Sequence, residues 1–504
     1  MKLDRICIIG GGSAGWMTAS MLSRHFEGTG IEITVVEADD IPRIGIGEST
    51  TQFFNTFIRY LGLKDEDWMP KCNATYKHSV KFTNFNQNGS FHYPFGPRGT
   101  DIPLTEYHNW RRGRNIDSMT FCRVFSDVID PIEGNRLYPP FLDRYVGYHV
   151  DALLFGDFLR DHYAIPKGVT HIKGKVTDIQ SCVDGISRVY LCGGDRYVDG
   201  DFFIDCTGFR GLLMNHLNVK WVDWSDLLKN NSTWAVRKPY TNKKEQLQPY
   251  TECTGLSSGW VWNVPTWDRI GTGYNYCSQY ITDEDALVEF KEHLGVDIPD
   301  DKFRLLKWPT GIRQKVWSHN VVSIGLSAGF IEPLESGGLY SVHEFLFKLI
   351  QVLPKSTTKW NAFQRAQFNH SVTSKFTSFR DFVVKHYTMG HRDDTPYWKD
   401  YTNMDSLIDL EDEEWLGEFP NLLTQEWENI QKINFMSEGE AYLLGGYEYD
   451  IMPEHYEMLS KENNYDIPDF EEPILRRTFM DQTLGRYPNA YEHYENHLYN
   501  GKGN

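Results

Sequence analysis

Three glycines near the N-terminus have the spacing of a dinucleotide-binding turn. Gly10, Gly12 and Gly15 form the pattern G-x-G-x-x-G, with Ser13 and Ala14 before the last glycine. Glycines at these positions allow a tight turn and a close approach of the backbone to a pyrophosphate, while the N-terminus of a following helix offers unpaired N–H donors to the anion. Glu37 lies close to the spacing, about 20 residues, at which an acid binds a ribose hydroxyl. The pattern predicts a site for FAD or for a nicotinamide dinucleotide.

The residues around these glycines predict one βαβ unit. An apolar strand, "RICIIG", precedes the glycines, a helical pattern, "AGWMTASMLSRHF", follows them, and a second strand, "IEITVVEADD", carries the acid. Later segments predict a helix in "DALLFGDFLRDHY" and strands in "GVTHIKGKVTDI", "ISRVYLCGG" and "DFFIDCTG". Beyond residue 350, "KWNAFQRAQFNHSVTSKFTSFRDFVVKHY" and "NLLTQEWENIQKI" are helical in pattern. We therefore expect a cofactor-binding module over residues 1–350, with an intercalated substrate-side sheet, and a mostly helical lobe over 351–504.

Two further segments favour FAD over a nicotinamide dinucleotide. One is "IPRIGIGEST", with Ile46 and Gly47, and the other is "DFFIDCTGFRG", in which a strand ends at Thr207 and Gly208. The pair resembles the arrangement of flavoprotein monooxygenases, whose distant loops return to hold the two ends of FAD. The sequence has no second G-x-G-x-x-G for NAD(P)H, which suggests that the flavin is reduced elsewhere. The predicted class is α/β, with the Rossmann-type FAD-binding fold of the flavin monooxygenase superfamily.

Composition excludes several classes of partner. The chain has 504 residues, of which 69 are acidic and 51 basic, and a net charge of −18 argues against binding to a nucleic-acid backbone. The eight cysteines are scattered, without a C-x-x-C pair or zinc spacing, so we expect reduced thiols and no metal site. The N-terminal apolar run is too short for a signal or membrane segment. These features predict a soluble, cytoplasmic protein without a membrane partner.

A tryptophan pair carries the most specific signal. In "GWVWNVP", alternation places Trp260 and Trp262 on one face of a strand that Pro265 ends, and core packing is the alternative role of such a pair. The run resembles the W-x-W-x-I-P signature of the flavin-dependent tryptophan halogenase family, with Val264 at the isoleucine position. The resemblance covers roughly residues 1–460 through "GGGSAGWMTA", "IGIGEST", "ATYKHSVKF", "GYHVDALLFGDFLR", "FIDCTGFRGLL", "IGLSAGFIEPLESGG" and "RDFVVKHYTMGHRDDTPYW". A marine-phage-type member is one alternative within the family.

The resemblance implies a halogenation reaction and names its residues. Reduced FAD, O2 and a halide give hypohalous acid, which moves through a channel to an organic substrate. Trp260 and Trp262, with Pro265, then separate the flavin from that substrate. Lys77 matches the lysine that hydrogen-bonds hypohalous acid or forms a haloamine. Glu335 matches the glutamate that polarises this species or accepts the proton of the arenium intermediate. Its alternative role is that of a helix-entry carboxylate, which Glu332 could fill equally well.

The resemblance also implies the positions of the cofactor and the halide. Leu326, in "IGLSAGF", joins the expected FAD contacts. Ser336, Gly337 and Gly338 align with the segment whose backbone N–H groups hold the halide. Relatives have threonine at the position of Gly337, so we expect a wider site, with bromide or iodide used beside chloride.

The substrate is the least defined part of the sequence. Tyr93 and Phe95, in "FHYPFG", match a histidine and a phenylalanine that sandwich indole in tryptophan-specific members, and a shift of one residue would place His92 there instead. The C-terminal clamp for free tryptophan has no secure counterpart. We therefore expect an electron-rich indole or phenol that lacks the amino-acid group or is carried on a larger molecule, stacked in an aromatic-lined pocket.

Two alternatives stay open at the level of sequence. One is a flavin monooxygenase that hydroxylates its aromatic substrate, and the other is a non-catalytic flavin-binding protein. The implied partner is a separate NAD(P)H-dependent reductase that supplies diffusible FADH2. The oligomeric state is open, with a homo-oligomer as one alternative.

Overall fold

The structure is a computed structural model. It describes residues 3–41, 45, 47–87, 89–97, 117–194, 196–353, 355, 360–390, 392–404, 442–443, 446–447 and 484–500. Ile46 and the predicted helix "NLLTQEWENIQKI" lie outside the described residues.

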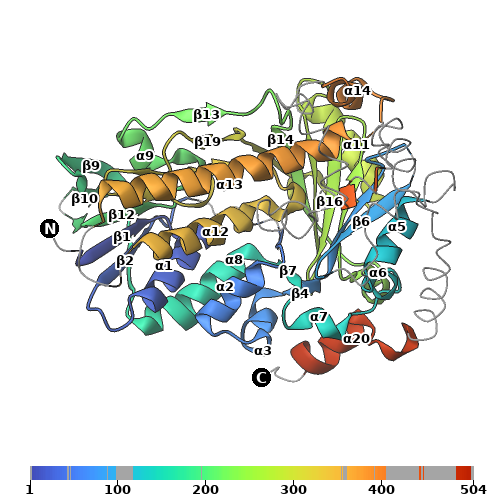
Figure 1. The fold of residues 1–504 in the computed structure, drawn as a ribbon, viewed down its shortest axis with the longest axis horizontal. Coiled ribbons are helices and arrows are strands. Elements are labelled where there is room, and N and C mark those ends of the chain that lie inside the picture. The colour runs from blue at the N-terminus through green and yellow to red at the C-terminus, as the bar shows by residue number, and fades with distance from the viewer. Residues whose placement is uncertain are drawn as a thin grey trace, which may run out of the picture.

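A six-stranded sheet forms the N-terminal end of the molecule (Figure 1). Its order is β20-β21-β12-β1-β2-β8, and all neighbours are parallel except β20 and β21. The strands are β1 (Arg5–Ile9), β2 (Glu32–Glu37), β8 (Thr170–Lys173), β12 (Phe202–Asp205), β20 (Trp317–Ser318) and β21 (Val321–Ser323). Helices α1 (Ser13–His25), α8 (Ala152–Phe158) and α12 (Gly337–Val352) pack together in the layer beside this sheet. Because the sheet is covered on both faces, β1 is apolar on both, as parallel strands require.

The predicted strand "GVTHIKGKVTDI" is wrong as a single element. Its first part is β8, whereas its second part, β9 (Val176–Cys182), joins an antiparallel sheet with β10 (Gly185–Leu191) and β11 (Tyr197–Asp199). The ladder of β8 ends where Gly174 N–H donates to the Glu37 carbonyl, and the chain then leaves the sheet. Residues of β10 and α9 (Leu212–His216) cover the second face of the six-stranded sheet.

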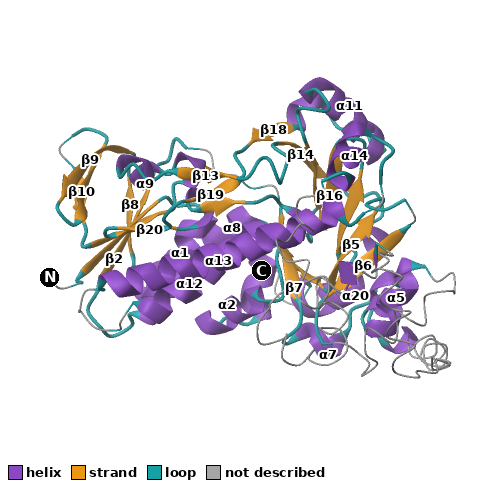
Figure 2. Cartoon of the chain, turned by 45° about the horizontal axis from the view of Figure 1, so that its top comes forward, coloured by secondary structure: helices purple, strands orange, loops and turns teal. Residues whose placement is uncertain are grey.

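A seven-stranded sheet builds the other end of the molecule (Figure 2). Its order is β18-β14-β17-β16-β15-β5-β6, antiparallel except for the β15–β5 pair. The strands are β5 (Ser79–Thr83), β6 (Ser90–Pro94), β14 (Ser232–Lys238), β15 (Thr251–Gly255), β16 (Gly259–Pro265), β17 (Ile270–Tyr276) and β18 (Arg304–Lys307). Pro265 opposite Ile270 is the last pair of β16, as its missing N–H predicts. Helix α11 (Asp283–Leu294) packs against β14 and β17.

The remaining strands of the described segments form two small sheets. The first has the order β3-β7-β4 and the second β13-β19-β22. Their strands are β3 (Glu48–Ser49), β4 (Thr75–Lys77), β7 (Gly147–Val150), β13 (Trp221–Asp223), β19 (Gly311–Arg313) and β22 (Gly329–Phe330). Because β3 and β4 both pair with β7, the first sheet holds Ser49, opposite His149, and Lys77, opposite Gly147, on its two sides.

The longest helix, α13 (Ala362–Thr388), links the two large sheets. It begins with a capping box between Asn361 and Gln364, packs along α12, and reaches the seven-stranded sheet at its C-terminal end (Figures 1 and 2). The other helices are α2 (Phe54–Leu61), α3 (Asp65–Trp68), α5 (Ser118–Phe125), α6 (Ile129–Glu133), α7 (Pro139–Leu142), α10 (Lys243–Gln246), α14 (Pro396–Thr402) and α20 (Ala490–Tyr494). The predicted α/β class with helices beyond residue 350 is confirmed.

Two observations bear on the expectations from composition. Within the described segments, no helix is both long and apolar enough to cross a bilayer. All eight cysteines lie in described segments and are unpaired.

Candidate functional site

A cavity of about 600 Å³ lies between the carboxyl edge of the six-stranded sheet and the seven-stranded sheet. The carboxyl edge is where open α/β sheets bind their ligands. Its wall contains these predicted FAD contacts: Gly10, Gly12, Ser13, Ala14, Glu37, Gly47, Thr207, Gly208 and Leu326. Farther along, the wall contains Trp260, Trp262, Glu335, Ser336 and Gly338. One continuous space therefore joins the glycine turn to the residues expected to carry the chemistry.

The glycine turn fits a dinucleotide. Gly10 has φ +113°, and a Cβ there would lie 2.3 Å from the Cys206 carbonyl oxygen. A Cβ at Gly15 would lie 1.9 Å from the Gly10 carbonyl oxygen, so Gly15 supports the turn from behind although it is not on the wall. Gly12 caps α1 without a side-chain hydrogen bond and has no atom within 4 Å of a Cβ position. Its backbone and the first turn of α1 are open to a pyrophosphate.

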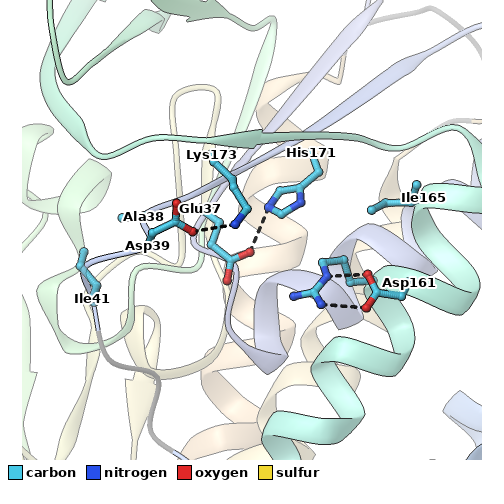
Figure 3. Close-up of a pocket in the computed structure, with 9 residues that line it drawn as sticks. Glu37, Ala38, Asp39, Ile41, Asp161, Ile165, His171 and Lys173 are labelled. Carbon is cyan, nitrogen blue, oxygen red and sulfur yellow. Dashed lines mark hydrogen bonds and ion pairs between the residues drawn. The ribbon is translucent and has the colours of Figure 1, made fainter.

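Glu37 ends β2 beside the same turn. Its side chain packs on Gly11, and its Oε2 lies 3.0 Å from His171 Nε2 (Figure 3). A second cavity, of about 400 Å³, shares Glu37, Ala38 and Ile41 with the first and is otherwise lined by Asp39, Arg160, Asp161, Ile165, His171 and Lys173. The basic side chains here are paired with acids, as in the Lys173–Asp39 and Arg160–Asp161 contacts (Figure 3). Sequence patterns gave no sign of His171.

Asp205 organises the loop that carries Thr207 and Gly208. Its Oδ1 accepts hydrogen bonds from the N–H and the hydroxyl of Thr207, at 3.0 and 2.6 Å. Its Oδ2 accepts from the N–H groups of Leu213 and Met214, at 2.8 and 3.1 Å. Burial raises the pKa of Asp205, and these four donors oppose the rise. The buried carboxylate thereby fixes the loop after β12 against the cavity.

The two tryptophans lie on one face of β16, as alternation predicts. Their ring centroids are 6.0 Å apart, both side chains are buried, and both line the cavity. Pro265 is not on the wall. Its carbonyl oxygen instead accepts a hydrogen bond from Thr75 Oγ1 at 2.6 Å, which ties the end of β16 to β4, two residues before Lys77.

Lys77 is fully buried beside the cavity. Its Nζ donates to Ser336 Oγ at 2.7 Å and to Ser49 Oγ at 3.2 Å, and these two hydroxyl oxygens are 2.5 Å apart. The Phe95 ring centroid is 5.1 Å from the same nitrogen. Burial lowers the pKa of Lys77 to about 8, although Glu335 opposes the change. Since Ser49 and Ser336 line the cavity, one hydrogen bond separates the ammonium from that space.

The turn before α12 has an unusual backbone. Glu335 and Ser336, with φ of 59° and 63°, are consecutive left-handed residues that are not glycine. Each such residue costs about 1–3 kcal/mol and persists only where its surroundings hold it. Ser336 is held by Lys77 and Ser49, and Glu335 Oε1 lies 3.0 Å from Nε2 of His386, on α13. Backbone strain is thus concentrated at the residues predicted to act in catalysis and halide binding.

Glu332 anchors the same turn from three residues earlier. It is fully buried and accepts hydrogen bonds from the Tyr387 hydroxyl and, at 3.2 Å, from Asn230 Nδ2. Burial raises the pKa of Glu332 to about 7. Glu332 is therefore not a helix-entry carboxylate. His386 and Tyr387, which are adjacent on α13, contact Glu335 and Glu332 respectively. No pattern in the sequence identified either of them.

The predicted halide segment differs from expectation at two residues. The Ser336 N–H already donates to the Pro333 carbonyl oxygen at 3.0 Å, whereas Gly337 and Gly338 begin α12. A Cβ at Gly337 would lie 2.7 Å from Phe379 Cε1. The expectation that the missing side chain widens the site is therefore wrong, because the Phe379 ring takes that space.

Glu48 is a further group beside this segment. A Cβ at Gly338 would lie 3.1 Å from Glu48 Oε2, and both residues line the cavity. Burial raises the pKa of Glu48 to about 7. Near neutral pH this carboxyl group is thus poised between its neutral and ionised forms.

Tyr93 lies in β6, and Phe95 directly follows it; the two side chains lie on the same side of this extended segment. Tyr93 lies 5.9 Å from Phe382 and 6.0 Å from Tyr442, between ring centroids, and Phe95 lies near Lys77. His92 points to the other side, where its Nδ1 is 2.8 Å from Ser79 Oγ and its Nε2 is 3.0 Å from Glu133 Oε1. The alternative alignment, shifted by one residue so that His92 takes the histidine position, therefore puts His92 on the side away from Tyr93 and Phe95.

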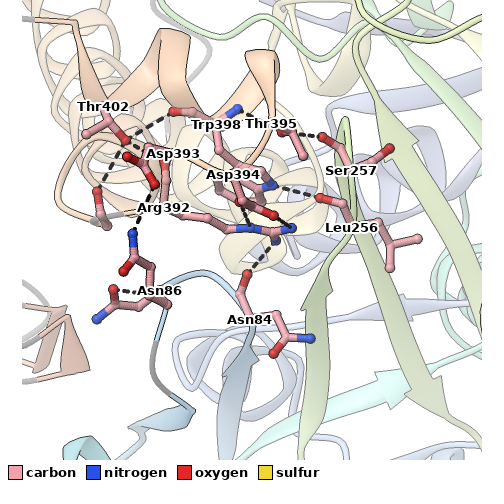
Figure 4. Close-up of polar contacts among 12 residues, drawn as sticks. Asn84, Asn86, Leu256, Ser257, Arg392, Asp393, Asp394, Thr395, Trp398 and Thr402 are labelled. Atoms are coloured by element: carbon pink, nitrogen blue, oxygen red, sulfur yellow. Dashed lines mark hydrogen bonds and ion pairs between the residues drawn. The ribbon is translucent and has the colours of Figure 1, made fainter.

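The chain after α13 is fastened to the seven-stranded sheet by residues that we call the Arg392 latch: Arg392, Asp394, Thr395 and Trp398 (Figure 4). Arg392 donates to the Asn84 carbonyl and to Asp394, each at 2.7 Å. Thr395 Oγ1 donates to the Ser257 carbonyl, and Trp398 Nε1 donates to the Leu256 carbonyl, also at 2.7 Å. The latch ties the segment after α13 to Asn84, next to β5, and to Leu256 and Ser257, between β15 and β16.

A Rossmann-type cradle opening into a shared cavity defines a dinucleotide-binding enzyme of the α/β class. Residues 5–437 match the protein family described as tryptophan halogenase. Tryptophan 7-halogenase RebH of Lentzea aerocolonigenes is 35% identical over 422 residues, which are 79% of this chain and 78% of RebH. Tryptophan 6-halogenase SttH of Streptomyces toxytricini is 35% identical over 426 residues, or 79% of this chain and 80% of SttH. The chain belongs to the tryptophan halogenase family, whose members are flavin-dependent oxidoreductases.

Solved structures agree with this assignment. The structure described as VirX1 apo superposes with a TM-score of 0.87 at 34% identity and covers 100% of both chains. The crystal structure of SttH superposes with a TM-score of 0.83 at 29% identity, covering 98% of this chain and 99% of its own. The cofactor is therefore FAD, used with a halide and O2, and the fit of the glycine turn agrees with it.

Proposed function

We propose that this enzyme halogenates an electron-rich aromatic compound of the indole or phenol type through hypohalous acid guided by Lys77 and Glu335. The observation that carries the proposal is the contact between the buried Lys77 ammonium and Ser336, in the wall of the cavity that begins at the glycine turn. When bound, reduced FAD supplies the activation of O2 that converts the halide into hypohalous acid. A separate NAD(P)H-dependent reductase provides the diffusible FADH2.

Trp260 and Trp262 keep the organic substrate away from the flavin end of the cavity. Both indoles are buried on the wall, and β16 is bonded on both edges by β15 and β17. A screen in the middle of a sheet is stiff, because neither edge of its strand is free. A small halogen-bearing molecule can pass such a screen where an aromatic ring cannot.

Lys77 receives the halogen species at the end of this path. With a pKa of about 8, the side chain exists as ammonium and as amine in the neutral to mildly alkaline range. The ammonium can donate a hydrogen bond to the oxygen of hypohalous acid, and the amine can instead attack the halogen to form a haloamine. Ser49 and Ser336 orient the nitrogen in either case.

Glu335 acts as the base and the adjacent turn as the halide site. The proton that leaves the ring carbon needs a nearby acceptor, and a carboxylate beside a lysine costs less to bury than either charge alone. The halide binds at the segment Ser336, Gly337 and Gly338. The N–H groups of Gly337 and Gly338, in the first turn of α12, are suited to an anion, whereas that of Ser336 is already bonded.

The aromatic substrate stacks at Tyr93 and Phe95. Both residues lie on the side of the strand that faces Phe382 of α13, and Phe95 is also next to Lys77. We propose that the segment 351–504 closes this pocket as a lobe, since Phe382 and Tyr442 already contact Tyr93. Because RebH and SttH are tryptophan halogenases by name, free tryptophan belongs among the compounds to be tested.

One assay separates this proposal from its alternatives. Purified protein is supplied with FAD, a flavin reductase, NADH and bromide, and is offered indole, a phenol and tryptophan, with products read by mass spectrometry. We expect a brominated ring from at least one compound and none from Lys77→Met, which still binds FAD. A hydroxylated product that forms without halide would make the enzyme a monooxygenase. Flavin binding without any product would make it a binding protein.

A further inference from the structure

His386 is a buried histidine with both ring nitrogens engaged. Its Nδ1 lies 2.9 Å from the carbonyl oxygen of Phe382, one turn earlier on α13. Its Nε2 lies 3.0 Å from Glu335 Oε1. The imidazole is fully buried, so these two contacts rather than water decide where its protons lie.

The two contacts determine a shared proton. A carbonyl oxygen only accepts hydrogen bonds, so Nδ1 carries a hydrogen. In a neutral ring Nε2 would then have a lone pair and would face an ionised carboxylate oxygen, and two acceptors do not attract at 3.0 Å. The pair therefore holds one proton between Nε2 and Oε1. It is either an imidazolium with a carboxylate, or a neutral imidazole with a carboxylic acid.

Other titratable groups face this pair from each element around it. Lys77 approaches from β4, Cys253 from β15, and Glu332 from the same turn. The Tyr447 hydroxyl donates to the backbone carbonyl of His386 at 2.6 Å. The Lys77 ammonium favours the ionised form of Glu335, because an opposite charge nearby stabilises a carboxylate. Of the two arrangements, imidazolium with carboxylate is the one that leaves Glu335 able to accept a proton.

We propose that His386 is a positioning residue for catalysis: it shares one proton with Glu335 Oε1 and so keeps this glutamate, which lines the cavity, ionised. The inference rests on the proposed function for the role of Glu335, but not for the shared proton itself. Tyr387, the next residue, donates a hydrogen bond to Glu332. The C-terminal end of α13 thus contacts both Glu332, which anchors the turn, and Glu335, the proposed base.

The halogenation step that His386 supports transfers the halogen to the ring and a proton to Glu335. The π electrons of the aromatic ring attack the halogen of hypohalous acid, the C–halogen bond forms, and the oxygen–halogen bond breaks to leave hydroxide. The proton on the attacked carbon passes to Glu335, and its C–H electron pair restores the aromatic ring. Glu335 returns that proton to hydroxide, giving water, so His386 keeps its own proton throughout.

Nuclear magnetic resonance tests the shared proton without any turnover. With 15N-labelled histidine, the His386 ring in the full-length protein is expected to carry a proton on both nitrogens at pH 7, and its signals are assigned by their loss in His386→Gln. In Glu335→Gln the ring is expected to become neutral, with hydrogen on Nδ1 alone. A neutral His386 in the wild-type protein would overturn the proposal. Should His386→Gln not fold, the histidine signals that change in Glu335→Gln assign the ring instead.

The pH dependence of turnover tests the role in catalysis. His386→Gln keeps an N–H donor for Glu335 but removes the positive charge, and the loss of an opposite charge disfavours the ionised form of a carboxylate. The acidic limb of the kcat profile for bromination should move to higher pH, with the KM for the aromatic compound and FAD binding unchanged. The matched control is Tyr401→Phe, which removes a buried hydroxyl that accepts from the Lys229 N–H and not one that binds the turn, and whose limb stays at the wild-type position. An unmoved limb in His386→Gln would refute the role. If the wild-type protein halogenates nothing, the proposed function fails, while the resonance experiment still decides the proton.

Discussion

The titration of Lys77 gives the most quantitative prediction. Burial lowers its pKa from 10.5 to about 8, and a difference of about 2.5 units corresponds to about 3 kcal/mol. Below pH 8 the folded protein bears the full cost of the buried ammonium. Between pH 8 and 10.5 the unfolded chain holds a proton that the folded chain has released, so the free energy of unfolding gains about 1.4 kcal/mol per pH unit from this residue.

Lys77→Met removes that contribution and leaves the other titrating groups in place. We expect the free energy of unfolding of the wild type, relative to the variant, to increase by about 2 kcal/mol from pH 8 to pH 9.5. Urea unfolding followed by tryptophan fluorescence at several pH values measures both proteins under identical conditions. If the two curves of unfolding free energy against pH run parallel, Lys77 does not titrate in this range, and the argument from its burial is wrong.

Three further predictions concern the flavin, the halide and the latch. Gly15→Ala should abolish FAD binding in a fluorescence titration, since its Cβ would lie 1.9 Å from the Gly10 carbonyl oxygen, and a normal affinity would contradict the packing described. Glu48 has a pKa of about 7, so its ionisation should weaken bromide binding as pH rises from about 6 to 7.5. Calorimetry should show a smaller dependence on pH in Glu48→Gln than in the wild type, and the same slope in both would exclude Glu48 as the cause. Arg392→Ala should lower the free energy of unfolding by about 1–3 kcal/mol through the lost bonds to Asn84 and Asp394, whereas unchanged denaturation would show that the latch adds no stability.

The sequence predicted the parts of the fold that local patterns determine. The first βαβ unit follows from apolar strands, glycines and helical periodicity that are all contiguous. The shared face of Trp260 and Trp262 follows from alternation alone. The strand "GVTHIKGKVTDI" failed because the break at Gly174 depends on a hydrogen bond to Glu37, which periodicity does not reveal.

The residues of the site could be predicted from the sequence only where they belong to a family motif. Lys77 and Glu335 became candidates through family resemblance, since nothing in composition distinguishes them from other charged residues. His386 and Asp205 had no such signal, because each acts through contacts that exist only after folding. His386 is 51 residues from Glu335, and helical periodicity predicts that it is buried but not what it faces. At Gly337 the sequence misled, because the neighbour that fills the space, Phe379, lies on another helix.

The hydrogen bond between Thr75 and Pro265 has a mechanical consequence. It joins the indole-bearing strand to the strand of the reactive amine at a point where both are paired to neighbours, so neither can drift relative to the other. In the proposed mechanism, the distance that hypohalous acid travels between the two strands would then be set by a rigid frame rather than by a loop. Aromatic compounds of different size would occupy the proposed site at Tyr93 and Phe95 without changing that distance.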